Sequence, residues 1–191
     1  MKILVVHQFF LSPGQPGGSR FNEMARLWRQ RGHEVVVIAG TLHHHTGQVP
    51  ARWQRRWITL EHDGDVSVWR CHVPRAYSRG YLGRMWGFLG FTLSAATAAL
   101  RAERPDVVIA TSPPLVAAFP GWLAARARWR RVPWVFEVRD LWPESAVTTG
   151  VLREGSPLTR LLYGVERWAC RSAAAINVLT PAFRDDIVRR G

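Results

Sequence analysis

Residues 133–145, PWVFEVRDLWPES, place several reactive side chains directly after a short apolar run. The run, residues 134–138, is typical of a strand buried on both faces of a parallel sheet, and Pro143 prevents that strand from continuing. Ligands of open α/β sheets bind outside the carboxyl ends of the strands, so we expect chemistry at this point. The side chains concerned are Arg139, Asp140, Trp142 and Glu144.

Two carboxylates at a strand end suit proton transfer. Asp140 or Glu144 could take a proton from a hydroxyl, or orient that hydroxyl by hydrogen bonding, in a pocket partly closed to water. A structural alternative uses the same residues, with Arg139 and Asp140 neutralising each other at the rim of the sheet while Trp142 packs. The sequence leaves both interpretations open.

A second group of residues with possible chemistry is the glycine-rich loop that ends in Gly17, Gly18 and Ser19. It precedes a predicted helix, so free backbone N–H groups at the helix start could receive a phosphate, and Arg20 could add a positive charge. A plain turn is the alternative. The dinucleotide fingerprint G-x-G-x-x-G fails here because Pro16 stands where the second glycine belongs, so we expect no NAD.

Other reaction types lack their characteristic motifs. The chain has no G-x-S-x-G elbow, no Walker A lysine, no C-x-x-C pair and no H-E-x-x-H. His43, His44 and His45 are adjacent and point in different directions, so we expect no metal site. We also expect no cofactor, and we interpret Cys71 and Cys170 as reduced thiols without a role.

The elements that must position these residues alternate between strands and helices. We expect one domain over residues 1–191 with an α/β fold: a Rossmann-like, doubly wound, mainly parallel sheet with helices on both faces. Residues 40–64 are expected to be irregular. The predicted strands are residues 3–9, 34–39, 66–71, 105–110, 134–138 and 174–179, and the predicted helices are residues 19–31, 81–101, 115–129, 158–169 and 180–190.

The charge of the chain favours anionic partners. Its formal net charge is +12, almost wholly from arginine. Such an excess attracts phosphate-bearing molecules or an anionic membrane surface, although an arginine-biased genome would produce it too. The sequence shows no secretory signal and no membrane-spanning segment, so we expect a cytoplasmic protein.

Five segments carry a resemblance to a known family. They are the glycine loop with GGSR, then RGHEVVVIAG, PDVVIATSPPL, VFEVRDLWPES and AAINVLTPAF, in this order. Together they resemble the N-terminal half of family 4 retaining glycosyltransferases of the GT-B fold. More narrowly, they are similar to bacterial enzymes that build O-antigen or capsule repeat units, among them the fucosamine-transferase-like group. The resemblance covers essentially the whole chain, and RDLWPES is its most specific part.

The resemblance implies an acceptor-binding domain of an enzyme that transfers a sugar from a nucleotide-sugar to a polyprenyl-diphosphate-linked glycan, in the synthesis of cell-surface polysaccharide. It places Asp140 at the transferred sugar as the catalytic residue. Residues facing the donor diphosphate are Gly17, Gly18, Ser19 and Arg20, and acceptor-binding residues are Arg139, Trp142, Glu144 and Ser112.

The family also implies a second, C-terminal domain that binds the nucleotide-sugar, and these 191 residues do not contain it. The family's signature of two glutamates separated by seven residues occurs nowhere in the sequence. We therefore expect this chain alone to be inactive and to bind the donor weakly.

A lipid-linked acceptor implies contact with the inner face of the cell membrane, and aromatic residues interleaved with arginines favour such a surface. The candidate residues are Arg52, Trp53, Arg55, Arg56, Trp57, Arg84 and Trp86. Ordinary core packing of residues 86–91 is the alternative. Two other functions stay open: a nucleic-acid-binding module, because ARWQRRW resembles single-strand binders, and half of a GT-B-shaped sugar-nucleotide epimerase. We expect no nucleic-acid partner.

Overall fold

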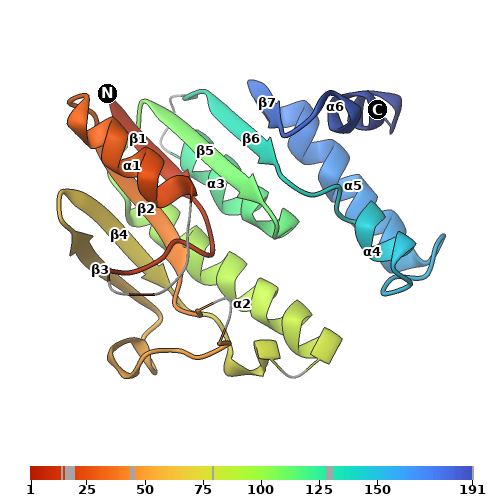
Figure 1. Cartoon of the computed structure of the whole chain (residues 1–191), viewed down its shortest axis with the longest axis horizontal. Coiled ribbons are helices and arrows are strands. Elements are labelled where there is room, and N and C mark those ends of the chain that lie inside the picture. Colours follow the sequence, from red (N-terminus) through yellow and green to blue (C-terminus); the bar gives the residue numbers. More distant parts are fainter. Residues whose placement is uncertain (14, 16–19, 44–45, 79, 128–130, 191) are drawn as a thin grey trace.

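The computed structural model describes residues 1–13, 15, 20–43, 46–78, 80–127 and 131–190, apart from the side chains of residues 78, 81 and 82. These residues form one seven-stranded sheet in the order β3-β4-β2-β1-β5-β6-β7 (Figure 1). The strands are β1 (Lys2–Val6), β2 (Glu34–Gly40), β3 (Ile58–Asp63), β4 (Val66–Cys71), β5 (Val107–Ser112), β6 (Trp134–Val138) and β7 (Ala175–Val178).

All neighbouring strands are parallel except β3 and β4, which pair antiparallel. The central strands β1 and β2 are runs of β-branched and apolar residues and are almost wholly buried, as expected for strands covered on both faces. The predicted doubly wound, mainly parallel sheet is therefore confirmed.

Helices cover the two faces of the sheet. They are α1 (Arg20–Gln30), α2 (Gly80–Arg101), α3 (Ala118–Arg126), α4 (Glu144–Thr148), α5 (Pro157–Ser172) and α6 (Pro181–Arg190), and three short 3-10 helices are Ala51–Trp53, Arg75–Ser78 and Leu115–Ala117. Phe21 and Ala25 of α1 pack on one face. Phe91 of α2, Ala118 of α3 and Ala169 of α5 pack on the other. The two hydrophobic cores hold the strand ends at fixed positions.

Local signals in the sequence mark several helix ends correctly. Gly32 follows α1 with a φ of 78°, the left-handed conformation expected of a helix C-cap. The Ser156 hydroxyl accepts a hydrogen bond from the Thr159 N–H at 3.2 Å, so Ser156 caps α5 and Pro157 is in the first turn.

Two elements differ from the prediction. Residues 58–63, expected to be irregular, form the edge strand β3, and a turn at Gly64 with a φ of 56° joins it to β4. Residues 58–63 form an exposed edge strand with several polar residues, so the alternation of apolar and polar residues that would predict a strand is weak. Residues 144–148, expected to be loop, form the short helix α4 after Pro143.

The loop after β1 is held in place by Arg70, a residue that the sequence analysis did not single out. Arg70 lies in β4 and is 1% exposed. Its guanidinium donates hydrogen bonds to the Phe10 carbonyl and the Ser12 hydroxyl, each at 2.6 Å, and it pairs with Glu61 at 2.6 Å. A buried arginine therefore fixes the chain that leads into the glycine loop.

Candidate active site at the carboxyl edge of the sheet

Polar residues occupy one level of the sheet where β1, β5 and β6 end. Thr111 pairs with Glu137, and Glu137 pairs with Asn177 of β7. His7 continues the same level, because Val6 pairs with Ala110 one residue earlier. Residues in register on parallel strands point to the same face, and the His7 ring lies 5.1 Å from the ring of Phe21 on α1. This polar row therefore lies on the face covered by α1.

Arg20 and Glu137 join the start of α1 to this row. The Arg20 guanidinium forms an ion pair with the Glu137 carboxylate, whose side chain is 3% exposed against 45% for that of Arg20. The sequence analysis gave Glu137 no role, because a single glutamate inside an apolar strand carries no motif. Its partner comes from a segment far away in the sequence.

Arg139 follows two residues after Glu137 and lies on the same face of β6. Its backbone N–H donates to the Ser112 carbonyl at 3.2 Å, which extends the β5–β6 ladder beyond Val138. Burial and the positive charge of Arg20 lower the pKa of Arg139, and the guanidinium nevertheless stays charged at neutral pH. Arg139 and the Arg20–Glu137 ion pair therefore lie on the same face of the sheet.

Asp140 is half-buried at the end of β6, and its Oδ2 accepts a hydrogen bond from the Ser145 hydroxyl of α4 at 3.1 Å. Within the described part of the chain, no ion pair joins Asp140 to Arg139. The arrangement leaves Asp140 at the edge of the sheet, oriented by a short helix that the sequence did not predict.

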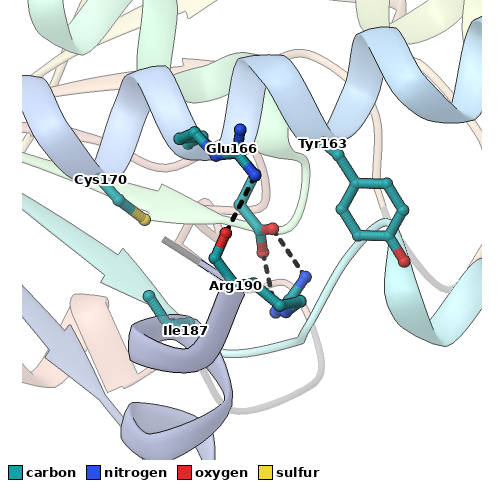
Figure 2. A pocket seen from close by; sticks show the side chains of 6 residues that line it. Tyr163, Glu166, Cys170, Ile187 and Arg190 are labelled. Carbon is teal, nitrogen blue, oxygen red and sulfur yellow. Dashed lines mark hydrogen bonds and ion pairs between the residues drawn. The ribbon is translucent and has the colours of Figure 1, made fainter.

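Glu144, the first residue of α4, accepts a hydrogen bond from the Tyr163 hydroxyl of α5. Burial and this bond raise the pKa of Tyr163 to about 12. Beyond Tyr163 is a pocket of about 260 Å³ between α5 and α6. In Figure 2 the Glu166 carboxylate faces the Arg190 guanidinium, and the two form hydrogen bonds of 2.7 and 3.3 Å. The Arg190 guanidinium also lies over the Tyr163 ring, so Tyr163 connects Glu144 to the end of α6.

The pocket beside α6 does not provide a reactive thiol. Cys170 lines it, and burial raises the pKa of that thiol to about 11. Burial likewise raises the pKa of Glu166 despite its contact with Arg190. A nucleophilic role for Cys170 at neutral pH is not supported, because the thiolate is the nucleophile.

Two further predicted site residues have different environments. Trp142 is half-buried and packs against Ala146, Leu152 and Leu162, so part of its ring supports the α4–α5 region. Ser112 is 1% exposed, and its hydroxyl has no hydrogen-bond partner among the described residues. The same holds for the hydroxyl of Thr111, which is fully buried. Gly17, Gly18 and Ser19 lie outside the described residues.

The aromatic and basic surface is only partly as predicted. Trp53 is 3% exposed, and its indole N–H donates to Glu61 at 3.1 Å, so its assignment to a membrane surface is wrong. Its ring stacks under Arg70, with 4.8 Å between the guanidinium carbon and the ring centroid. Arg52, Arg55, Arg56 and Arg84 are exposed, as are Trp57 and Trp86.

An apolar strip runs along α2 beside these residues. Trp86, Leu89, Leu93 and Leu100 recur at helical spacing and are all exposed. The indole N–H of Trp57 donates to Thr97 of α2 at 3.1 Å, which places Trp57 beside the strip. We call Trp57, Trp86, Leu89, Leu93 and Leu100 the α2 strip. Phe91, in contrast, is fully buried in the core.

No helix among the described residues is long and apolar enough to cross a membrane. No group of three or more histidine, cysteine, aspartate or glutamate side chains in that part of the chain could hold a metal ion.

A doubly wound, mainly parallel sheet with helices on both faces defines a Rossmann-like α/β domain. Residues 17–191 match the family described as the glycosyl transferase 4-like domain, and the chain belongs to that family. A search of curated proteins found no match.

Similarity to a solved structure supports the fold. The chain is similar to an α,α-trehalose-phosphate synthase (UDP-forming) from Burkholderia vietnamiensis, with a TM-score of 0.58, 14% identity, and coverage of 99% of this chain and 42% of that one. It also matches the catalytic domain of starch synthase IV from Arabidopsis thaliana bound to ADP and acarbose, with a TM-score of 0.48, 14% identity, and coverage of 73% and 34%. The chain spans less than half the length of each of these proteins.

Proposed function

We propose that this chain is the acceptor-binding domain of a retaining glycosyltransferase that takes a sugar from a nucleotide-sugar. The match of residues 17–191 to the glycosyl transferase 4-like family carries the proposal. The polar carboxyl edge supports it, since Arg20 is exposed there, Asp140 is half-buried, and ligands of open α/β sheets bind at that edge. The similar trehalose-phosphate synthase is described as UDP-forming, which supports a nucleotide-sugar as donor.

Asp140 is the proposed catalytic residue. In the transfer, the acceptor hydroxyl forms a bond to the anomeric carbon while the bond from that carbon to the donor diphosphate breaks, and the diphosphate leaves with the electron pair. Asp140 orients the acceptor hydroxyl or takes its proton. Its bond to Ser145 fixes the carboxylate for that task. Gly17, Gly18, Ser19 and Arg20 are proposed to face the donor diphosphate, and Arg139, Trp142, Glu144 and Ser112 to bind the acceptor.

A second domain is proposed to complete the enzyme. The chain covers 42% of the similar synthase, and an open sheet edge does not enclose a reaction. Closure of two domains would exclude water and bring the donor to Asp140. We therefore propose that the isolated chain transfers no sugar.

The acceptor is proposed to be a glycan on a polyprenyl diphosphate, as in O-antigen or capsule synthesis by fucosamine-transferase-like enzymes, and the enzyme to act at the inner face of the cell membrane. The five side chains of the α2 strip are exposed, and so are three arginines that are near them in the sequence, Arg56, Arg84 and Arg101. Apolar side chains flanked by arginines suit the interface of an anionic bilayer. The contact would be peripheral.

A turnover assay tests the proposal. The 191-residue chain and a two-domain protein that contains it are compared, using uridine-diphosphate sugars and a polyprenyl-linked acceptor. We expect transfer by the two-domain protein alone, and micromolar donor binding by the isolated chain would contradict the assignment of donor binding to a second domain. Absence of transfer by the two-domain protein with every donor tested would contradict the proposed activity.

A further inference from the structure

Helix α6 has little apolar contact with the rest of the domain. None of its residues is buried, and its contact with the hydrophobic core comes from Ile187, which is half-buried. Helix α5, in contrast, buries Leu162 and Ala169. Because most helices in proteins are stabilised by packing of an apolar face, polar contacts must supply more of the attachment of α6.

Arg190, in the last turn of α6, makes several of these polar contacts. Its guanidinium donates to the Glu166 carboxylate of α5 at 2.7 and 3.3 Å, and its backbone carbonyl accepts from the Arg167 guanidinium at 3.0 Å (Figure 2). The Arg190 guanidinium also pairs with Asp186, one turn earlier in α6, at 2.7 Å. Arg190 therefore attaches α6 to α5 and is itself held in place by α6.

Glu166 makes this attachment depend on the positive charge of Arg190. The Glu166 side chain is 8% exposed. Burial raises its pKa, and Arg190 opposes that shift. A buried carboxylate that loses its cation is strongly unfavourable, so release of α6 would leave Glu166 uncompensated. The ion pair therefore favours the docked position of α6.

Tyr163 connects the attachment of α6 to the candidate site. Its hydroxyl donates to the Glu144 carboxylate at the start of α4. The guanidinium carbon of Arg190 lies 5.6 Å from the centroid of the Tyr163 ring. Because a cation is attracted to the face of an aromatic ring, Arg190 helps to hold the ring in the orientation from which its hydroxyl reaches Glu144.

We propose that Arg190 is a positioning residue that acts on Glu144 through Tyr163, and that its ion pair with Glu166 is a latch between α5 and α6. With α6 docked on α5, Glu144 and α4 are held in place; with α6 released, they are free to move. The latch depends only on contacts between α5 and α6. Its effect on acceptor binding rests on the proposed function, in which Glu144 binds the acceptor.

Hydrogen–deuterium exchange of the 191-residue chain tests the latch. Arg190→Gln removes the charge-assisted bonds to Glu166, so amides of α6 should exchange about tenfold faster or more, while those of β6 keep their wild-type rates. Arg184→Gln is the matched control, because Arg184 lies on the same helix, is exposed and pairs with its neighbour Asp185. Equal exchange of α6 in the two variants would overturn the latch. If Arg190→Gln does not fold, Glu166→Gln, which removes the charge of the other partner, is measured in the same way.

The same experiment tests the connection to Glu144 through the amides of α4. Tyr163→Phe removes the hydroxyl and should speed exchange in α4 while leaving α6 unchanged. Arg190→Gln should speed exchange in both helices, but combined with Tyr163→Phe it should add nothing at α4, because the hydroxyl that transmits its effect is gone. A general loss of stability would not depend on Tyr163 in this way. Unchanged exchange of α4 in Arg190→Gln, or a further increase in the double variant, would overturn the positioning role.

Kinetics of the two-domain protein test the effect on acceptor binding. We expect Arg190→Gln to raise the KM for acceptor about threefold and to leave kcat unchanged, and Arg184→Gln to change neither. An unchanged KM would overturn this effect. Failure of the proposed function is distinguishable: the expected exchange pattern in a protein that transfers no sugar would retain the latch and reject the transferase, whereas sugar transfer with unchanged exchange in Arg190→Gln would reject the latch alone.

Discussion

The Tyr163 hydroxyl of α5 donates a hydrogen bond to the Glu144 carboxylate at the start of α4. The bond connects an expected acceptor-binding residue to a long, well-packed helix, whereas α4 itself has only five residues. The same Tyr163 ring lies 5.6 Å from the guanidinium carbon of Arg190. Tyr163 therefore positions Glu144.

Tyr163→Phe should impair use of the acceptor more than it impairs folding. Loss of one hydrogen bond is expected to cost about 1 kcal/mol of stability, while a misplaced Glu144 should raise the KM for acceptor by about tenfold in the two-domain enzyme. Steady-state kinetics and denaturant unfolding measure the two effects. Tyr77→Phe, outside this network, is the control, and equal kinetic effects of the two variants would contradict the positioning role.

The same tyrosine predicts an alkaline effect on stability. Its pKa is raised to about 12 by burial and by the bond to Glu144, against a value of 10.0 for the unfolded chain. Between these values the unfolded chain releases the proton and the folded protein keeps it, so stability falls as pH rises from about 10 to 12. Wild type should lose more stability than Tyr163→Phe over this window, as measured by denaturant unfolding at several pH values. Parallel losses in both proteins would contradict the assigned pKa.

Asp140→Asn should reduce turnover and leave stability nearly unchanged. The Asp140 carboxylate is half-buried at a strand end, where water can reach it. The amide oxygen of asparagine can accept the hydrogen bond from the Ser145 hydroxyl in its place. Loss of proton transfer is expected to lower kcat of the two-domain enzyme by about 10²–10⁴-fold. The melting temperature is measured on the same samples, with Asp106→Asn at the opposite edge of the sheet as control. A large drop in melting temperature that matches the loss of turnover would restore a structural role for Asp140.

Arg70→Met should be strongly destabilising. The substitution leaves Glu61 and the Phe10 carbonyl without their buried partner, and removing one member of such a pair costs about 3–5 kcal/mol. Denaturant unfolding compares it with Arg52→Met, an exposed arginine of the same region. If the two variants are equally stable, Arg70 does not anchor the loop.

Leu89→Gln combined with Leu93→Gln should weaken binding to anionic vesicles. Both side chains are exposed, so the double variant should fold normally while losing apolar contact with the bilayer. Sedimentation with vesicles of anionic lipid at low and high salt measures the effect, and Val188→Gln on α6 is the exposed control. Absence of wild-type binding at low salt would reject the membrane contact.

The spacing of apolar residues, together with glycine, proline and serine at the ends of elements, was sufficient to predict most of the strands and helices. Residues 66–71 and 134–138 were predicted as strands with the bounds that the structure has. The caps at Gly32 and Ser156 were also predictable, because a left-handed residue and a side-chain cap are local features. Arg139 and Asp140 also follow directly after a buried strand, as predicted.

Contacts between distant segments could not be predicted in this way. Trp53 looks like an exposed aromatic among arginines, yet Glu61 and Arg70 bury it. Glu137 looks like an interruption of an apolar strand, and its partner is Arg20, at the start of α1. The spacing of apolar residues predicts which face of a strand or helix is buried. The residue that pairs with a buried charge depends instead on the order of the strands in the sheet. That order, β1 beside β5 and β5 beside β6, brings the start of α1 close enough to β6 for Arg20 to pair with Glu137.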